Sequence, residues 1–239
     1  MRFIALIAAL CSVCSAQEYS EFHGTYIHSR FVEVLNETRS LQRALSARPL
    51  AEPVYMVIDS TKPNGEVAVA YTLGNQQQLL CRKSSFAHAG IKWGIGNEQG
   101  PYWVLTRDEK AGSYIALTPA DSLENQPIVL GKLPSKNADP MFIIRRMVNA
   151  SMLAGTWELD PKKSIEFTNN QFMVVNGKPL PYTLQFSPDG ARITLITTSG
   201  RPLKWDVQRD GPNLTMRALQ QHKGTVLPLA TARLRFLRK

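Results

Sequence analysis

Cysteine is scarce in this chain. Of its three cysteines, Cys11 and Cys14 lie within the first sixteen residues. If that segment is removed on export, Cys81 remains alone and no intramolecular disulfide can form. A chain of this length can bury enough apolar surface to fold without such cross-links. We expect Cys81 to be a small buried hydrophobe on a strand.

Catalytic and cofactor signatures are missing as well. The sequence has no Gly-x-Ser-x-Gly elbow, no His-Glu-x-x-His pair and no phosphate loop. Only four histidines are present. Of these, His23 and His28 are five residues apart on one expected strand, so they point to opposite faces and cannot hold one ion together. We expect both to lie at the surface or in turns, and we expect no enzyme activity, no metal and no cofactor.

Long apolar runs are absent too, which excludes a transmembrane segment, because a spanning helix needs about 20 apolar residues. The net charge is +9, but the basic residues are spread over the whole chain. No recognition helix, zinc pair or aromatic-basic strand accompanies them, so we expect no nucleic-acid partner.

What is present at the N-terminus is a short leader. Arg2 precedes an apolar stretch from Phe3 to Leu10, and small residues end at Ala16 before Gln17. This order of segments is typical of a secretory signal peptide. We predict a signal peptide over residues 1–16, cleavage near Ala16-Gln17, and a periplasmic or extracellular mature protein.

Turn signals recur through the C-terminal third. They are Asn176-Gly177, Asp189-Gly190, Ser199-Gly200 and Asp210-Gly211, and apolar and polar residues alternate between them. This pattern predicts an antiparallel meander with one buried face over residues 155–239. Leu203, Trp205 and Val207, for example, are expected to face inward together.

A helix is predicted over residues 139–154, with Asp139 as its N-cap and Pro140 in its first turn. It separates two β-rich halves. Residues 17–138 are expected to form the first, with a helix over 29–47 that follows a strand at 24–26. Further strands are expected at 54–58, 67–73, 79–83, 91–95, 102–107, 114–118 and 127–130.

The opening Gly155-Thr156-Trp157, followed by a short-turn meander, resembles bacterial lipocalin-like domains of the calycin type. The resemblance implies an up-and-down barrel with Trp157 packed across one end, and an arginine over that tryptophan, for which Arg233 and Arg235 are the candidates. The first half opens with Gly24-Thr25-Tyr26 and resembles a more diverged version of the same lipocalin-like domain. The fold class expected is therefore mainly β, with two antiparallel meander barrels joined by a short helix. A single merged barrel or sandwich is the alternative.

Such domains hold small apolar molecules, and the first half contains a strand that is apolar on both faces. We predict a cavity for a small apolar or amphipathic ligand, with the helix over 29–47 as its lid. Its expected lining comprises Tyr71, Trp93, Tyr102, Trp103, Phe31 and Leu35. Ordinary core packing explains the same residues. Two other functions stay open: a packed interaction module with an envelope protein partner, and an enzyme working in a barrel mouth.

Overall fold

The computed structural model describes residues 20–62, 65–86, 90–107, 113–122, 125–134, 139–160, 163–200, 202–222 and 225–236. For 159–160, 220–222 and 225–236 only the backbone is described. The predicted signal peptide and its cleavage site lie outside these residues. Within this part of the chain, no helix combines the length and the apolar character needed to cross a membrane.

The described chain divides into two compact units. Residues 20–29, 52–71 and 76–134 form the first, and residues 30–51, 72–75 and 139–236 form the second. Both are built on antiparallel β-sheet, so the protein is mainly β, as expected. The restart of the strand pattern after the helix at 140 does separate two sheets.

The first unit is a closed barrel in which each strand pairs with its sequence neighbours and the last pairs with the first. A short 3-10 turn, Ser20–Phe22, precedes it. Its strands are β1 Gly24–His28, β2 Tyr55–Ile58, β3 Glu66–Ala70, β4 Gln77–Phe86, β5 Gly90–Asn97, β6 Gly100–Arg107, β7 Tyr114–Pro119 and β8 Ile128–Lys132. Every strand that the sequence predicted in this half is present.

The interior of the first barrel is filled by alternate residues of its strands, because successive side chains of a strand point to opposite faces. Cys81 is one of them and is buried, which confirms its expected role. The interior residues are Phe22, Tyr26, Met56, Ile58, Val67, Val69, Leu79, Cys81, Ile95, Trp103, Leu105, Ile115, Leu117, Ile128 and Leu130.

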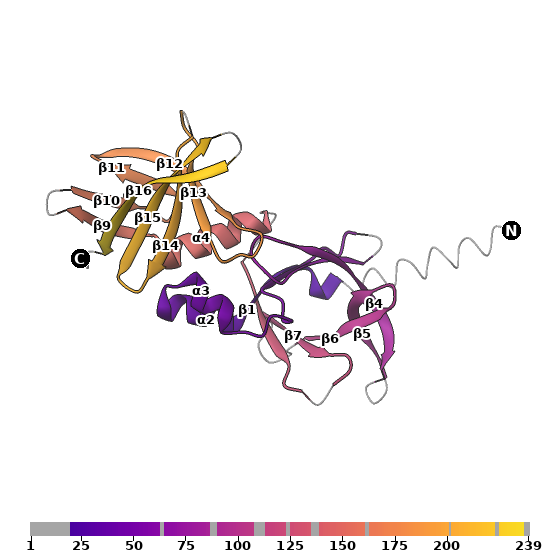
Figure 1. Ribbon diagram of the computed structural model, residues 1–239. Helices are drawn as coiled ribbons and strands as arrows, with labels where there is room; N and C mark the ends of the chain where they lie inside the picture. The colour runs from indigo at the N-terminus through magenta and orange to yellow at the C-terminus, as the bar shows by residue number, and fades with distance from the viewer. Residues whose placement is uncertain are drawn as a thin grey trace. The chain divides into compact units, whose positions relative to one another are not determined.

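The second unit contains a second antiparallel meander. Its strands are β9 Gly155–Asp160, β10 Lys163–Phe167, β11 Phe172–Val175, β12 Lys178–Phe186, β13 Ile193–Thr197, β14 Lys204–Asp210, β15 Asn213–His222 and β16 Thr225–Phe236. In Figure 1 these strands, in orange to yellow, curl around a common interior. The sheet closes where β16 meets β9, and the pairs found there among the described residues are Arg235 with Glu158 and Phe236 with Trp157.

The four predicted turns of this unit all fall between consecutive strands. In each of them the glycine has a positive φ, from 56° at Gly211 to 74° at Gly177. Asn176 also has a positive φ, of 50°, so the two-residue β11–β12 turn has the mirror-image geometry that matches the twist of paired strands. One inward prediction is wrong: Leu203 is half exposed, because β14 begins only at Lys204.

Helix α4 spans Pro140–Met152 and is capped as predicted, since the Asp139 carboxylate accepts a hydrogen bond from the Met141 amide. Its buried residues include Asn149, which bridges the helix to the sheet. The Asn149 amide donates to the Thr168 carbonyl at 2.9 Å, and its side-chain oxygen accepts the Tyr182 hydroxyl. A buried polar group needs such partners, so this network sets how α4 is positioned on the second sheet.

The helix predicted over residues 29–47 is two helices, α2 Ser29–Thr38 and α3 Leu41–Ser46. Arg39 between them has a φ of 54°, and the Ser40 side chain accepts the Arg43 amide as the N-cap of α3. A residue with left-handed backbone ends an α-helix, and a capping serine begins a new one. The apolar spacing alone therefore predicted one helix where local backbone chemistry produces two.

These two helices belong to the second unit, although the sequence placed them in the first half. Polar contacts join them to the rest of that unit. Asn36 accepts a hydrogen bond from the Ser151 hydroxyl at 2.7 Å, and Arg39 donates to the Ser151 carbonyl at 3.1 Å. Arg43 pairs with Asp210 at 3.2 Å. The helices thus contact the end of α4 and the β14–β15 turn of their own unit.

Burial raises the pKa of Tyr182 well above the ordinary tyrosine value. At alkaline pH the unfolded chain then loses this proton while the folded chain keeps it, so the free energy of unfolding falls as pH rises above about 10. Tyr182→Phe is expected to reduce that fall. Urea unfolding at pH 9 and pH 11 measures it, with the same substitution at the exposed Tyr102 as control. An equal pH dependence in Tyr182→Phe and the parent chain contradicts the assignment.

Candidate ligand-binding site

A hollow with a volume of about 660 Å³ lies at one end of the first barrel. Three strands and the turn before β1 supply its walls. The lining residues are Glu21, Phe22, Lys83, Ile91, Lys92, Trp93, Leu105, Thr106 and Arg107. Because β4, β5 and β6 are neighbours in the sheet, residues distant in sequence meet here.

The floor of the hollow is apolar. Phe22 and Leu105 are buried and belong to the barrel core, and Trp93 packs against that core while remaining half-buried. The strand register explains the grouping, since Trp93 is paired with Lys83 on one side and with Leu105 on the other. An accessible indole at the end of a packed interior offers a flat apolar surface to a ligand.

The rim of the hollow is cationic. Lys83, Lys92 and Arg107 are all exposed, and Glu21 is the one acidic residue among the described residues of the lining. Glu21 and Arg107 are 3.9 Å apart with side chains 46% exposed on both sides. The Lys83 ammonium lies 5.5 Å from the centre of the Trp93 ring. The hollow therefore combines an aromatic floor with positive charge at its edge.

The predicted lining residues are not all brought together. Trp93 lines the hollow, whereas Trp103 is buried in the core of the same barrel. Tyr102 alternates with Trp103, so its side chain lies on the outer face of the sheet, 43% exposed. Tyr71 packs against the barrel core, near the β3–β4 connection at the opposite end from the hollow.

Phe31 and Leu35 are fully buried, but in helix α2 of the second unit. They therefore do not line the hollow with Trp93. Of the six predicted lining residues, Trp93 is the one found in the lining of this hollow.

Sequence reasoning missed the cationic rim, although the signal was available. Leu79, Cys81 and Lys83 alternate along one strand, and so do Trp103, Leu105 and Arg107 along another. Residues two apart share a face, so in both strands an inward apolar series ends in a cation. The predicted strands 79–83 and 102–107 end at these two cations, but no role was predicted for either cation.

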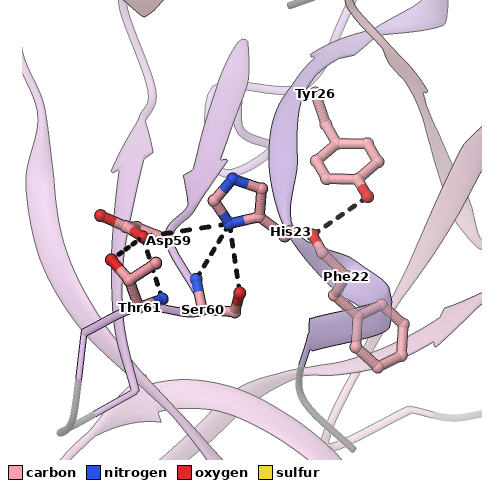
Figure 2. Close-up of polar contacts among 6 residues, drawn as sticks. All are labelled: Phe22, His23, Tyr26, Asp59, Ser60 and Thr61. Atoms are coloured by element: carbon pink, nitrogen blue, oxygen red, sulfur yellow. Dashed lines mark hydrogen bonds and ion pairs between the residues drawn. The ribbon is translucent and has the colours of Figure 1, made fainter. Parts of the chain in front are cut away.

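A second group of polar residues, at the same end of the barrel, contains the residue types of a hydrolase. Figure 2 shows His23 beside Asp59 and Ser60. The Ser60 amide donates to His23 Nδ1 at 3.2 Å, the Ser60 hydroxyl lies 3.2 Å from the same nitrogen, and Asp59 lies 3.9 Å from it. In a catalytic triad the serine and the carboxylate engage opposite ring nitrogens. All three contacts here converge on Nδ1.

Asp59 has a structural task in this group. Hydrogen bonds from the Thr61 hydroxyl, at 2.6 Å, and from the Thr61 amide, at 3.0 Å, lower the pKa of Asp59. A carboxylate that accepts from the residue two positions on forms a turn of the backbone. The group therefore braces the connection after β2 to the turn before β1, where the Tyr26 hydroxyl also donates to the Phe22 carbonyl (Figure 2).

The histidines differ in part from expectation. His23 is exposed, as predicted, but His28 is buried and its Nε2 lies 2.9 Å from the Glu52 carboxylate. Among the described residues, no group of three or more histidine, cysteine or acidic side chains is arranged to hold a metal ion.

Two smaller hollows lie in the second unit, with volumes of about 500 and 280 Å³. The larger is lined in part by Arg39, Ser151 and Arg209, and both arginines already donate to the Ser151 carbonyl. The smaller is lined mostly by polar residues of α3, β13 and β14 and their turns. Neither presents an aromatic surface, which leaves the mouth of the first barrel as the better candidate.

Comparison with known proteins gave no family model that matches the chain. Neither the curated proteins nor the solved structures gave a match.

Proposed function

We propose that this chain is an exported, non-enzymatic binding protein for a small amphipathic molecule, held at the mouth of the first barrel. The leader over residues 1–16 supports export, and the closed up-and-down topology supports kinship with lipocalin-like proteins. The observation that carries the proposal is the half-buried indole of Trp93 on the apolar floor of a hollow of about 660 Å³. This volume suits a small molecule.

The apolar part of the ligand lies against Trp93, Phe22 and Leu105 in this proposal. Removing such surface from water is favourable by about 25 cal/mol per Å². The floor is already formed and packed on the barrel core. Binding therefore orders few protein groups, and little of the favourable free energy is offset by lost conformational entropy.

Trp93→Ala is expected to weaken binding of a neutral apolar dye, N-phenyl-1-naphthylamine, by about tenfold, or about 1.4 kcal/mol. The reason is the loss of the aromatic surface from the floor. Dye fluorescence in a titration of the purified full chain measures the affinity. The matched control is Tyr102→Ala, which removes an aromatic residue from the outer face of the same sheet. Equal weakening by both variants, or by neither, contradicts the site.

The alternative proposal is an interaction module with a protein partner of the cell envelope. The large apolar side chains exposed in the described chain lie on separate elements, such as Leu50 after α3, Ile91 in β5 and Phe142 in α4. Singly exposed apolar residues are normal for soluble proteins. Absence of dye binding, together with a ligand-free mass of the purified chain in native mass spectrometry, favours this alternative.

A further inference from the structure

Two of the three cations at the mouth of the first barrel, Lys83 and Arg107, occupy positions on the inward face of their strands. Along β4, Leu79 and Cys81 point inward, and Lys83 is the next residue on that face. Along β6, Trp103 and Leu105 point inward and Arg107 follows on the same face. A charge that merely improves solubility belongs on the outer face of a strand. These two end apolar inward series and border the hollow.

Among the described residues, the lining carries more positive than negative charge. Three cations, Lys83, Lys92 and Arg107, stand there with one carboxylate, that of Glu21. The contact between Glu21 and Arg107 is long and exposed, at 3.9 Å, so it holds the guanidinium weakly. The arginine is therefore able to turn to a second anion, for which its planar group offers two parallel donors.

The positive field of Arg107 reaches the barrel interior. Tyr26 lies on the inner face of β1, and although burial raises the pKa of its hydroxyl, the charge of Arg107 acts in the opposite direction and favours the phenolate. Charge at the edge of a concave, low-dielectric surface is less screened than charge on a convex one, so it attracts anions into the hollow.

We infer that the ligand is an amphipathic anion, whose acidic group contacts Lys83, Lys92 and Arg107 while its apolar part lies against Trp93. This inference rests on the proposed function and adds the charge of the ligand to it. The Lys83 ammonium, 5.5 Å from the Trp93 ring, brings the charged and apolar contacts within the reach of one small molecule.

The test compares two probes of equal chain length, decanoate and 1-decanol, as competitors of N-phenyl-1-naphthylamine on the full chain. The parent protein is expected to bind decanoate at least tenfold more tightly than decanol. In the double variant Lys83→Met and Arg107→Met, the affinity for decanoate is expected to fall at least tenfold, and that for decanol to stay within twofold. Raising the salt concentration from 0.05 to 0.5 M is expected to weaken the binding of decanoate and to leave the binding of decanol unchanged.

The matched control is Lys178→Met with Arg217→Met, which removes the same charge from exposed positions of the second unit. It is expected to leave both affinities unchanged. If decanoate and decanol bind the parent chain equally well, the anion inference is overturned while the binding function stands. If neither displaces the dye and the dye itself does not bind, the proposed function fails, and the inference with it. A loss of decanoate binding in the control variant as large as in the test variant also overturns the inference.

Discussion

Trp157→Ala is expected to lower the free energy of unfolding of the second unit by about 3–5 kcal/mol, as large-to-small changes of buried aromatic residues do. Trp157 is completely buried and is the largest side chain so enclosed in the described chain. Its indole donates to the Leu153 carbonyl at 2.6 Å, just past the end of α4. The substitution thus leaves a cavity and removes a hydrogen bond between the helix end and the first strand of the sheet.

Hydrogen exchange followed by mass spectrometry measures this effect by segment. Peptides from β9 to β14 are expected to lose protection, whereas peptides from β4 to β6 of the first barrel keep theirs. Trp157→Phe fills most of the space but lacks the N–H group. It is expected to lower the free energy of unfolding by about 1–2 kcal/mol. If Trp157→Ala lowers the free energy of unfolding no more than Trp157→Phe does, packing at this position is not what stabilises the unit.

Arg209→Met is expected to destabilise the same unit by about 2–4 kcal/mol. The Arg209 guanidinium donates to the Met152 carbonyl at 2.6 Å, to Ser151 at 3.3 Å and to Gly211 at 2.8 Å. Two of these acceptors are the last residues of α4, whose final carbonyls have no partner within the helix. Methionine fills the space but leaves these acceptors without this donor, which is unfavourable in a buried place.

Arg209 also stacks on Trp157, with its guanidinium carbon 4.8 Å from the ring centre. Burial, and to a lesser degree the nearby Arg39, lowers the pKa of Arg209 to about 10, so it remains charged at neutral pH. The matched control is Arg39→Met, which removes one hydrogen bond to the Ser151 carbonyl. Arg39→Met is expected to lower the free energy of unfolding by about 1 kcal/mol. Equal urea midpoints for the two variants would falsify the capping role of Arg209.

The arginine over the tryptophan illustrates what residue patterns miss. The lipocalin-like resemblance pointed to Arg233 or Arg235 near the C-terminus, and their side chains lie outside the described part of the chain. In the structure Arg209 of β14 takes this place. Arg209 follows Trp205 and Val207 on one strand face, so its inward direction was readable from the sequence. That it meets Trp157 and the end of α4 depends on how the sheet curves.

Strands and turns were predicted well because their signals are local. Alternation reports which residues share a face, and a glycine with an adjacent asparagine, aspartate or serine reports where the chain reverses. The candidate site was predicted only through Trp93. Its cations were not, because alternation puts Lys83 and Arg107 on the inward faces of their strands but does not show that the two strand ends border one hollow.

By itself, the sequence determined that this protein is mainly β, that it has two antiparallel meanders, and that a capped helix stands between them. Each of these follows from interactions within a few residues. The tertiary structure alone decided that α2 and α3 belong to the second unit and that Lys83, Trp93 and Arg107 meet at one barrel mouth. The physical reason is that these outcomes depend on strand register, sheet closure and long-range polar contacts, which join residues far apart in the chain.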